Sequence, residues 1–204
     1  MPDTYLIPKL QAGEIHRTEI TIKRSRFITS IGHTRGSEEA RDFIKKISSE
    51  FSDARHNCFA YNGSKPGETG YAGCSDDGEP HGTAGQPMLN IILHSDIGEI
   101  TAVVTRYFGG ILLGTGGLVK AYQESVKKAL QSLPTEPMRL RKNFAVLLAP
   151  KFTRQFLKLA EQSDAQILSR KFTDKCEFIV AVPEDQEERF TGQTGALRAQ
   201  IRSL

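Results

Sequence analysis

The sequence predicts an α+β fold made of two two-layer α/β sandwich domains, spanning residues 1–134 and 137–204. In the first part, strand-like and helix-like patterns follow one another in the order ββαβαβα, which is typical of helices packed on a sheet. The second part has the order βαββα of a ferredoxin-like plait, and residues 199–204 could supply its last strand. Pro134 and Pro137 end a helical pattern between the two parts, so the boundary is expected there.

Each element is predicted from its own pattern. Alternation of β-branched residues over 19–34 predicts one strand broken near Ser25, or two strands. A helix is expected over 36–51 because apolar residues recur at helical spacing, and we interpret Ser37 as its N-cap. The other elements expected in the first domain are strands at 55–62 and 98–108 and helices at 86–96 and 116–133. Those expected in the second are strands at 139–149, 165–172 and 175–183 and helices at 151–163 and 184–200.

Composition bounds the class of protein. The 204 residues are 38% hydrophobic and 25% charged, which is ordinary for a soluble globular chain. No apolar run is long enough to span a bilayer, and the N-terminus lacks the layout of a signal peptide. Three cysteines without a CxxC pair fit a reducing compartment. We therefore expect a cytoplasmic protein without a membrane partner, and its net charge of +3 does not by itself indicate nucleic acid.

A glycine-rich stretch precedes the helix expected at 116–133. Bare amides at a helix N-terminus bind anions, so this stretch is a candidate phosphate site. It lacks the GK[ST] ending of a P-loop and the GxGxxG dinucleotide fingerprint, so a nucleotide cofactor is disfavoured and no cofactor is expected. The alternative is plain turn geometry. The candidate residues here are Gly109, Gly110, Gly114, Thr115 and Gly116.

Three residues just upstream, Arg106, Tyr107 and Phe108, strengthen the anion interpretation. An arginine and two aromatic rings beside bare amides could pair with a phosphate and stack a base. The alternative for the same residues is an ion pair and two core rings.

The long loop at 63–85 carries a second glycine-rich stretch, which runs into the helix whose first turn holds Pro87. Gly82 and Thr83 are its candidate anion-binding residues. Acidic and histidine side chains in the loop could instead hold a metal or perform acid–base chemistry, although a short acidic cluster is more often a polar loop with a helix cap. The metal candidates are Asp76, Asp77, Glu79, His81 and His56, and the zinc alternative is His56, Cys58, Cys74 and His81, whose spacing is not that of common zinc modules.

Basic residues are the last candidate group. They bear on nucleic-acid binding only if they converge beside the glycine-rich stretches, because such clusters otherwise form solvated faces. No Ser–His–Asp arrangement or GxSxG elbow is present, so no nucleophile is predicted. In the first domain the cations are Lys23, Arg24, Arg26, Arg55, Arg106 and Lys120, and in the second they are Arg139, Arg141, Lys142, Lys151, Arg154 and Lys158.

The motifs resemble those of the Impact family, in its bacterial branch. The segment GQPMLNIILHSDIGEITAVVTRYFGGILLG at 85–114 resembles the family signature, and IKRSRF, RHNCFAYN and SDDGEPHGTAG resemble further family blocks in the same order. The resemblance covers about 18–133 and implies a first domain similar to domain 2 of ribosomal small-subunit protein five, with a left-handed crossover. The second domain resembles a ferredoxin-like plait module of elongation factor G. Both relatives act on RNA or the ribosome, which favours translation-linked binding over catalysis.

The resemblance transfers no catalytic residue. Eukaryotic Impact proteins restrain a stress kinase by means of an additional RWD domain, and this chain starts almost directly with the shared domain, so that mechanism is not expected here. The sequence therefore favours a non-enzymatic protein that binds RNA, the ribosome or translation factors and is linked to translation regulation. Two alternatives stay open: a metal-assisted hydrolase using the loop at 75–83, and a protein-binding adaptor.

Overall fold

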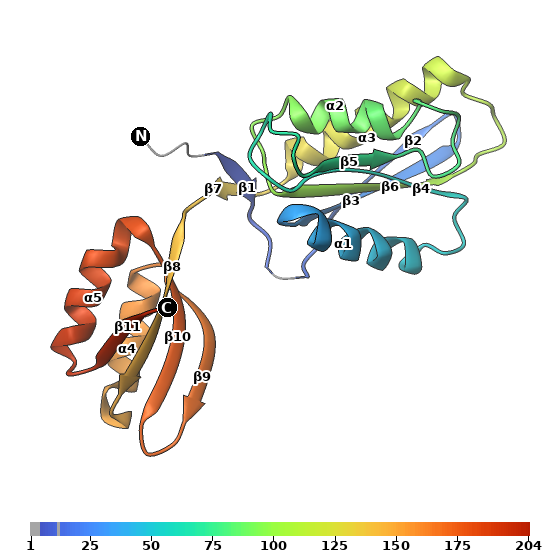
Figure 1. The fold of residues 1–204 in the computed structure, drawn as a ribbon. Coiled ribbons are helices and arrows are strands. Elements are labelled where there is room, and N and C mark those ends of the chain that lie inside the picture. The colour runs from blue at the N-terminus through green and yellow to red at the C-terminus, as the bar shows by residue number, and fades with distance from the viewer. Residues whose placement is uncertain (1–4, 12) are drawn as a thin grey trace. The chain divides into compact units, whose positions relative to one another are not determined.

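The computed structural model describes residues 5–11 and 13–204, which fall into two compact units meeting at Met138 and Arg139 (Figure 1). The mixed α/β class predicted from the sequence is confirmed. The N-terminal unit is built on a five-stranded sheet in which every neighbouring pair is antiparallel, in the order β2-β3-β6-β4-β5. Its strands are β2 (His16–Ile22), β3 (Ser25–His33), β4 (His56–Asn62), β5 (Ala72–Ser75) and β6 (Ile100–Tyr107).

Helices cover both faces of this sheet. α2 (Gly85–Leu93) and α3 (Thr115–Ser132) pack on one face, and α1 (Gly36–Glu50) packs on the other (Figure 1). α1 thus adds a third layer to the two layers expected from the sequence. The reason lies in β3 and β6, where nearly every residue is buried, as is typical of strands covered on both sides.

Local signals explain most of the element boundaries. The interruption near Ser25 is a hairpin, because Lys23 and Arg24 both adopt positive φ, as a two-residue turn with a strand-compatible twist requires. The expectation for Ser37 is wrong: Arg35 occupies the N-cap of α1, and its amide donates to the Glu39 carboxylate at 2.7 Å. A side chain from the first turn therefore caps the helix in place of Ser37.

Three short strands were not predicted. The loop at 63–85 contains β5, whose four residues are too few to show alternation. In addition, β1 (Leu6–Pro8) pairs with β7 (Thr135–Pro137), so a segment near the chain start joins the segment that follows α3. Their identity as strands depends on this long-range pairing.

The C-terminal unit is a four-stranded antiparallel sheet in the order β11-β8-β10-β9, the order of a ferredoxin-like plait. The last strand suggested by the sequence is present as β11. Phe156, Phe178 and Phe190 form the centre of the core between the sheet and the helices. The elements are β8 (Arg141–Leu148), α4 (Thr153–Gln162), β9 (Gln166–Phe172), β10 (Cys176–Pro183), α5 (Glu187–Ala196) and β11 (Gln200–Ser203). Within the described part of the chain, no helix combines the length and apolarity needed to cross a membrane.

Candidate nucleic-acid interface

Segments far apart in the sequence meet at one end of the N-terminal sheet. In the strand register, Phe27 near the start of β3 lies opposite Arg106 near the end of β6, and Arg106 lies opposite His56 at the start of β4. The β2–β3 turn, the chain leaving β6 and the chain entering β4 therefore share this end. It brings the predicted cations Lys23, Arg24 and Arg55 to one side of the domain. We call it the basic end of the sheet.

The N-terminus of α3 also lies at the basic end. Lys128 donates to the backbone oxygen of Glu19 at 2.9 Å, and His16 contacts Ser132 at 3.0 Å. The last turns of α3 are therefore beside the first residues of β2. Since the helix and the strand run antiparallel, the first turns of α3 lie beside the end of β2.

The glycine-rich segment before α3 is attached to the β2–β3 turn at Gly109. Its amide donates to the hydroxyl of the buried Ser25 at 3.2 Å. A Cβ at Gly109 would overlap the Arg24 carbonyl group, so only glycine permits this close backbone approach. This amide is consequently occupied within the protein.

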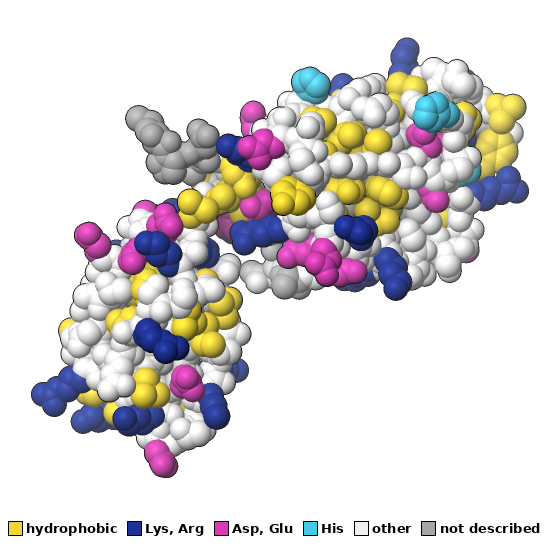
Figure 2. All heavy atoms as spheres, in the orientation of Figure 1, with side chains coloured by type: hydrophobic (Ala, Val, Ile, Leu, Met, Phe, Trp, Pro, Cys, Tyr) yellow, Lys and Arg dark blue, Asp and Glu magenta, His cyan; other side chains and the backbone are white. Residues whose placement is uncertain are grey.

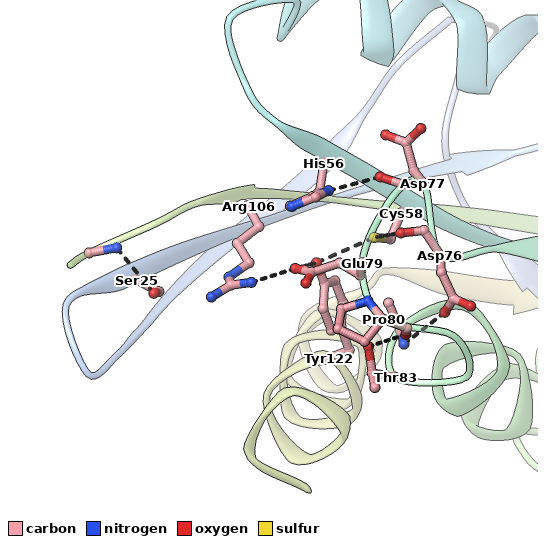
Figure 3. Close-up of polar contacts among 12 residues, drawn as sticks. Ser25, His56, Cys58, Asp76, Asp77, Glu79, Pro80, Thr83, Arg106 and Tyr122 are labelled. Atoms are coloured by element: carbon pink, nitrogen blue, oxygen red, sulfur yellow. Dashed lines mark hydrogen bonds and ion pairs between the residues drawn. The ribbon is translucent and has the colours of Figure 1, made fainter. Parts of the chain in front are cut away.

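A buried polar cluster lies under the basic end (Figure 3). Nη1 of Arg106 is 2.6 Å from Oε1 of Glu79, and the Tyr122 hydroxyl donates to the same oxygen at 2.8 Å. The Cys58 thiol in turn donates to Tyr122 at 3.3 Å. The Arg106 and Glu79 side chains are 9% and 3% exposed, so the ion pair is almost completely dehydrated. The cluster fastens the loop holding Glu79 to β6 and α3.

Burial determines the protonation state of the Cys58 and Tyr122 side chains in this cluster. It raises the pKa of Cys58 to about 12, against a smaller lowering by the hydrogen bond to Tyr122. Burial, with the nearby thiol and carboxylate, also raises the pKa of Tyr122 far above its usual range. Both groups keep their protons at neutral pH, so Cys58 is not an activated nucleophile.

The N-terminus of α2 already holds an anion, the Asp76 carboxylate. The amides of Gly82, Ala84 and Gly85 donate to it at 2.8, 3.0 and 2.8 Å. Burial tends to raise the pKa of Asp76, but these hydrogen bonds outweigh it and lower the pKa below 3.8. Thr83 donates to the Pro80 carbonyl instead of facing outward. The predicted role of Gly82 and Thr83 in binding an external anion is therefore not supported.

The acidic loop does not assemble a metal site. Asp76 is directed at α2, Glu79 at Arg106, and the carboxylate of Asp77 points away from both (Figure 3). His81 is fully exposed, and His56 contacts the carbonyl of Asp77. Among residues 5–11 and 13–204, no three His, Cys, Asp or Glu side chains are grouped to hold a metal ion. Hydrogen bonds thus direct Asp76, Glu79 and His56 to different partners, and His81 lies 3.8 Å from the Asp76 carboxylate, so neither predicted ligand set is assembled among the described residues.

The N-terminus of α3 differs from that of α2. Its N-cap is Gly114, with φ of 72°, and no side chain caps it among the described residues. The first amides of a helix have no acceptor inside the helix, and Thr115 and Gly116 are exposed. This terminus remains open to an external anion.

Four cations at the basic end have no acidic partner within the part of the chain that the structure describes: Lys23, Arg24, Arg55 and Lys120. Arg26 differs, since it forms an exposed ion pair with Glu19 at 3.0 Å and lies over the Tyr107 ring at 5.6 Å. The charge of Arg106 is neutralised by Glu79 in the buried ion pair, so Arg106 is not available to a ligand. Its contribution is to position the loop that follows β6.

Exposed apolar side chains accompany these cations. Phe108 is 51% exposed and Leu112 is 81% exposed, and Ile111 lies between them in the sequence. Figure 2 shows hydrophobic side chains projecting beside Lys or Arg at the end of the unit where the β6–α3 loop runs. The Phe108 ring lies 5.8 Å from the Arg106 guanidinium. Ile111 and Leu112 were not predicted as site residues, because an apolar run beside a strand resembles a segment of the core.

The predicted cations at the start of the C-terminal unit are paired internally. Arg139 and Arg141 both contact the Asp164 carboxylate, at 3.7 and 2.8 Å. Lys142 pairs with Glu187 at 2.7 Å. Their charge is largely compensated by these acids, so the structure gives no support for an anion-binding role of Arg139, Arg141 or Lys142.

Comparison with known proteins places these features in a family. The Impact N-terminal domain model matches residues 23–130, which contain all of the basic end. An IMPACT family member of Haemophilus influenzae is 43% identical over 189 residues, covering 93% of this chain and 90% of that protein. The IMPACT family member YigZ of Escherichia coli is 50% identical over 134 residues, covering 66% of this chain and 64% of YigZ.

A solved structure is similar to this chain over both units. A crystal structure described as that of a hypothetical protein has a TM-score of 0.66 and 37% identity, and covers all of this chain and 98% of its own. The resemblance inferred from the motifs is confirmed.

Proposed function

We propose that this chain, which belongs to the Impact family, binds structured RNA of the translation machinery, without catalysis, at the basic end of its N-terminal sheet. The observation that supports the proposal is that the strand register and the α3–β2 contacts bring to this end three segments whose four cations have no acidic partner among the described residues. The same end carries the N-terminus of α3, which no described side chain caps, and the exposed ring of Phe108. The cations are Lys23, Arg24, Arg55 and Lys120.

The chemistry of the surface fits a nucleic acid. Lysine and arginine neutralise phosphates and release counterions, while free amides at the start of α3 offer additional donors to phosphate oxygens. Phe108 offers a ring face on which an unpaired base can stack. The translation link comes from the resemblance of the two domains to ribosomal small-subunit protein five and to elongation factor G, both of which act on RNA or the ribosome.

Binding of a fluorescent ribosomal RNA hairpin tests the proposal. With about four phosphate contacts, the logarithm of the association constant should fall with the logarithm of salt concentration at a slope of about −3 to −4. Anisotropy titrations from low to moderate salt measure this slope. Absence of binding, or binding that salt does not weaken, contradicts the proposal.

A pair of charge-reversal variants locates the contact. Arg55→Glu combined with Lys120→Glu should weaken binding at least about tenfold and reduce the salt slope by about 2. The matched control, Lys45→Glu with Lys127→Glu, makes the same change in net charge at two exposed lysines, one on α1 and one further along α3 than Lys120, neither of which has an acidic partner among the described residues. Equal losses in both variants would show that only total charge matters.

A protein-binding adaptor is the second candidate function, because Ile111 and Leu112 expose apolar surface that RNA does not need. Leu112→Ser separates the two functions. If RNA is the ligand, the affinity for RNA should change less than about twofold in this variant, since a leucine makes no phosphate contact. Loss of a captured protein partner without a change in RNA affinity would favour the adaptor.

A further inference from the structure

A second surface lies in the C-terminal unit, along β9. This strand forms one margin of the four-stranded sheet (Figure 1). All seven of its residues are exposed, in contrast to β10, its only neighbour in the sheet, where six of eight are buried. Edge strands present unpaired backbone donors and acceptors on their outer side, which an extended polypeptide can complete.

The side chains of β9 add an apolar surface to this edge. Ile167 lies opposite Val180, and Phe172 lies opposite Cys176, so both point to the face on which the helices cover β10. Ile167 is 40% exposed and Phe172 is 56% exposed. The cover provided by α4 therefore does not extend over β9. Leu168, 54% exposed, falls at the irregularity in the β9–β10 pairing.

Charge indicates what can bind there. Arg170 and Lys171 lie on β9, and neither forms an ion pair within the described residues, although Glu177 of β10 lies opposite Lys171 in the register while Arg170 lies opposite Phe178. α4, which packs beside β9, exposes Arg154 and Lys158, and the turn just before it exposes Lys151; none of the three has an acidic partner among the described residues. A second copy of β9 pairing antiparallel would bring these like charges together, which is unfavourable. A nucleic acid would leave the edge donors, acceptors and apolar side chains unused.

We propose that β9 is a docking edge for an extended, acidic polypeptide segment that pairs with it as an additional strand and places its apolar side chains against Ile167 and Phe172. This surface is in the other unit and takes another class of ligand than the RNA site, so it stands or falls independently of the proposed function. Backbone pairing would supply affinity, and Arg170 with Lys171 would select acidic segments.

The test uses the full chain and a labelled ten-residue peptide that alternates glutamate with valine. We expect saturable binding that is absent for a lysine–valine peptide of the same length and for an acidic peptide interrupted by proline. Hydrogen exchange should show new amide protection in 166–172 when the acidic peptide is added. Equal binding of the basic peptide, or protection confined to other segments, overturns the proposal.

Two variants make the test specific. Arg170→Glu should weaken peptide binding about tenfold, because it replaces attraction with repulsion. Arg202→Glu is the matched control, an equal charge change at an exposed arginine on β11, at the opposite margin of the same sheet. Melting curves show whether each variant is folded. An equal loss in both variants overturns the proposal.

Leu168→Asn probes the apolar contribution and distinguishes other occupants. We expect about threefold weaker peptide binding from the loss of an exposed apolar contact. A dimer of the wild-type chain in sedimentation analysis that Leu168→Asn dissociates would assign the edge to a second copy. Protection of 166–172 by ribosomal RNA would assign it to nucleic acid. Either result overturns the proposal.

Discussion

Two glycine-rich segments precede helices in the N-terminal unit, and they differ in whether a side chain of the protein occupies the helix N-terminus. In the segment at 76–85, the carboxylate of Asp76 accepts three amides at the start of α2. In the segment at 109–117, no side chain of the described residues caps α3, and Thr115 and Gly116 at its start are exposed. The first terminus is filled by the protein itself, and the second is available to a ligand.

This difference indicates that a glycine-rich helix N-terminus can bind an external anion only where no carboxylate of the protein already accepts its amides. Asp76 reaches α2 because the loop carrying it is fastened by Glu79 to Arg106 and Tyr122. The segment before α3 has no acidic residue between Phe108 and Thr115. Four predictions sharpen this comparison.

The largest effect is expected for Glu79→Gln, which removes the counter-charge of the buried Arg106. Breaking a buried ion pair by deleting one partner leaves an uncompensated charge, so the free energy of unfolding should fall by about 3 to 5 kcal/mol. Urea denaturation measures the change.

The matched control for this variant is Glu19→Gln, which breaks the exposed pair with Arg26. Exposed pairs are screened by water, so its cost should stay below about 1 kcal/mol. Similar losses in the two variants would show that the buried cluster does not hold the loop.

Next in size is Asp76→Asn, which removes the internal anion from the start of α2. Losing a charged acceptor of three amides should cost about 2 kcal/mol at neutral pH. Since the pKa of Asp76 is lower in the folded protein than its ordinary 3.8, its stabilisation is present above that pH and is lost as the pH falls below it. Denaturation at several pH values should therefore show the wild type and variant converging in acid. A constant difference would contradict this role.

A third prediction concerns Gly109→Ala in the other segment. The new Cβ would overlap the Arg24 carbonyl group, and the backbone must shift to admit it. We expect a loss of about 2 kcal/mol in the free energy of unfolding, together with weaker RNA binding, because the glycine segment separates from the β2–β3 turn. A variant as stable as the wild type would show that this contact is not needed.

The smallest effect is expected for Gly116→Ala, in the first turn of α3. Apart from its chain neighbours and the backbone of α3, no atom of the described residues lies within 4 Å of the position its Cβ would take. The substitution restricts the unfolded chain and suits a helix, so stability should rise by about 0.5 kcal/mol in thermal denaturation. Destabilisation would indicate that the open start of α3 is more constrained than its exposure suggests.

Local patterns account for the parts of the fold that were predicted well. The amphipathic helix at 116–133 and the strand at 98–108 were recognisable because their apolar spacing is regular. β5 and the β1–β7 pair were not, since three or four residues carry no period and become strands only through distant partners. For the site, sequence identified the Lys23–Arg26 turn and the glycine segment but not the exposure of Leu112.

The sequence by itself determined the helices and long strands, the two glycine-rich helix starts and the family, because these depend on residue order over short distances. Only the tertiary structure decided which helix start is filled, which cations are neutralised and which carboxylates are buried. Those outcomes depend on partners such as Asp76 with Gly85, Glu79 with Arg106 and Arg141 with Asp164. A charge that looks free in the sequence becomes available or compensated only when folding brings, or fails to bring, its opposite within reach.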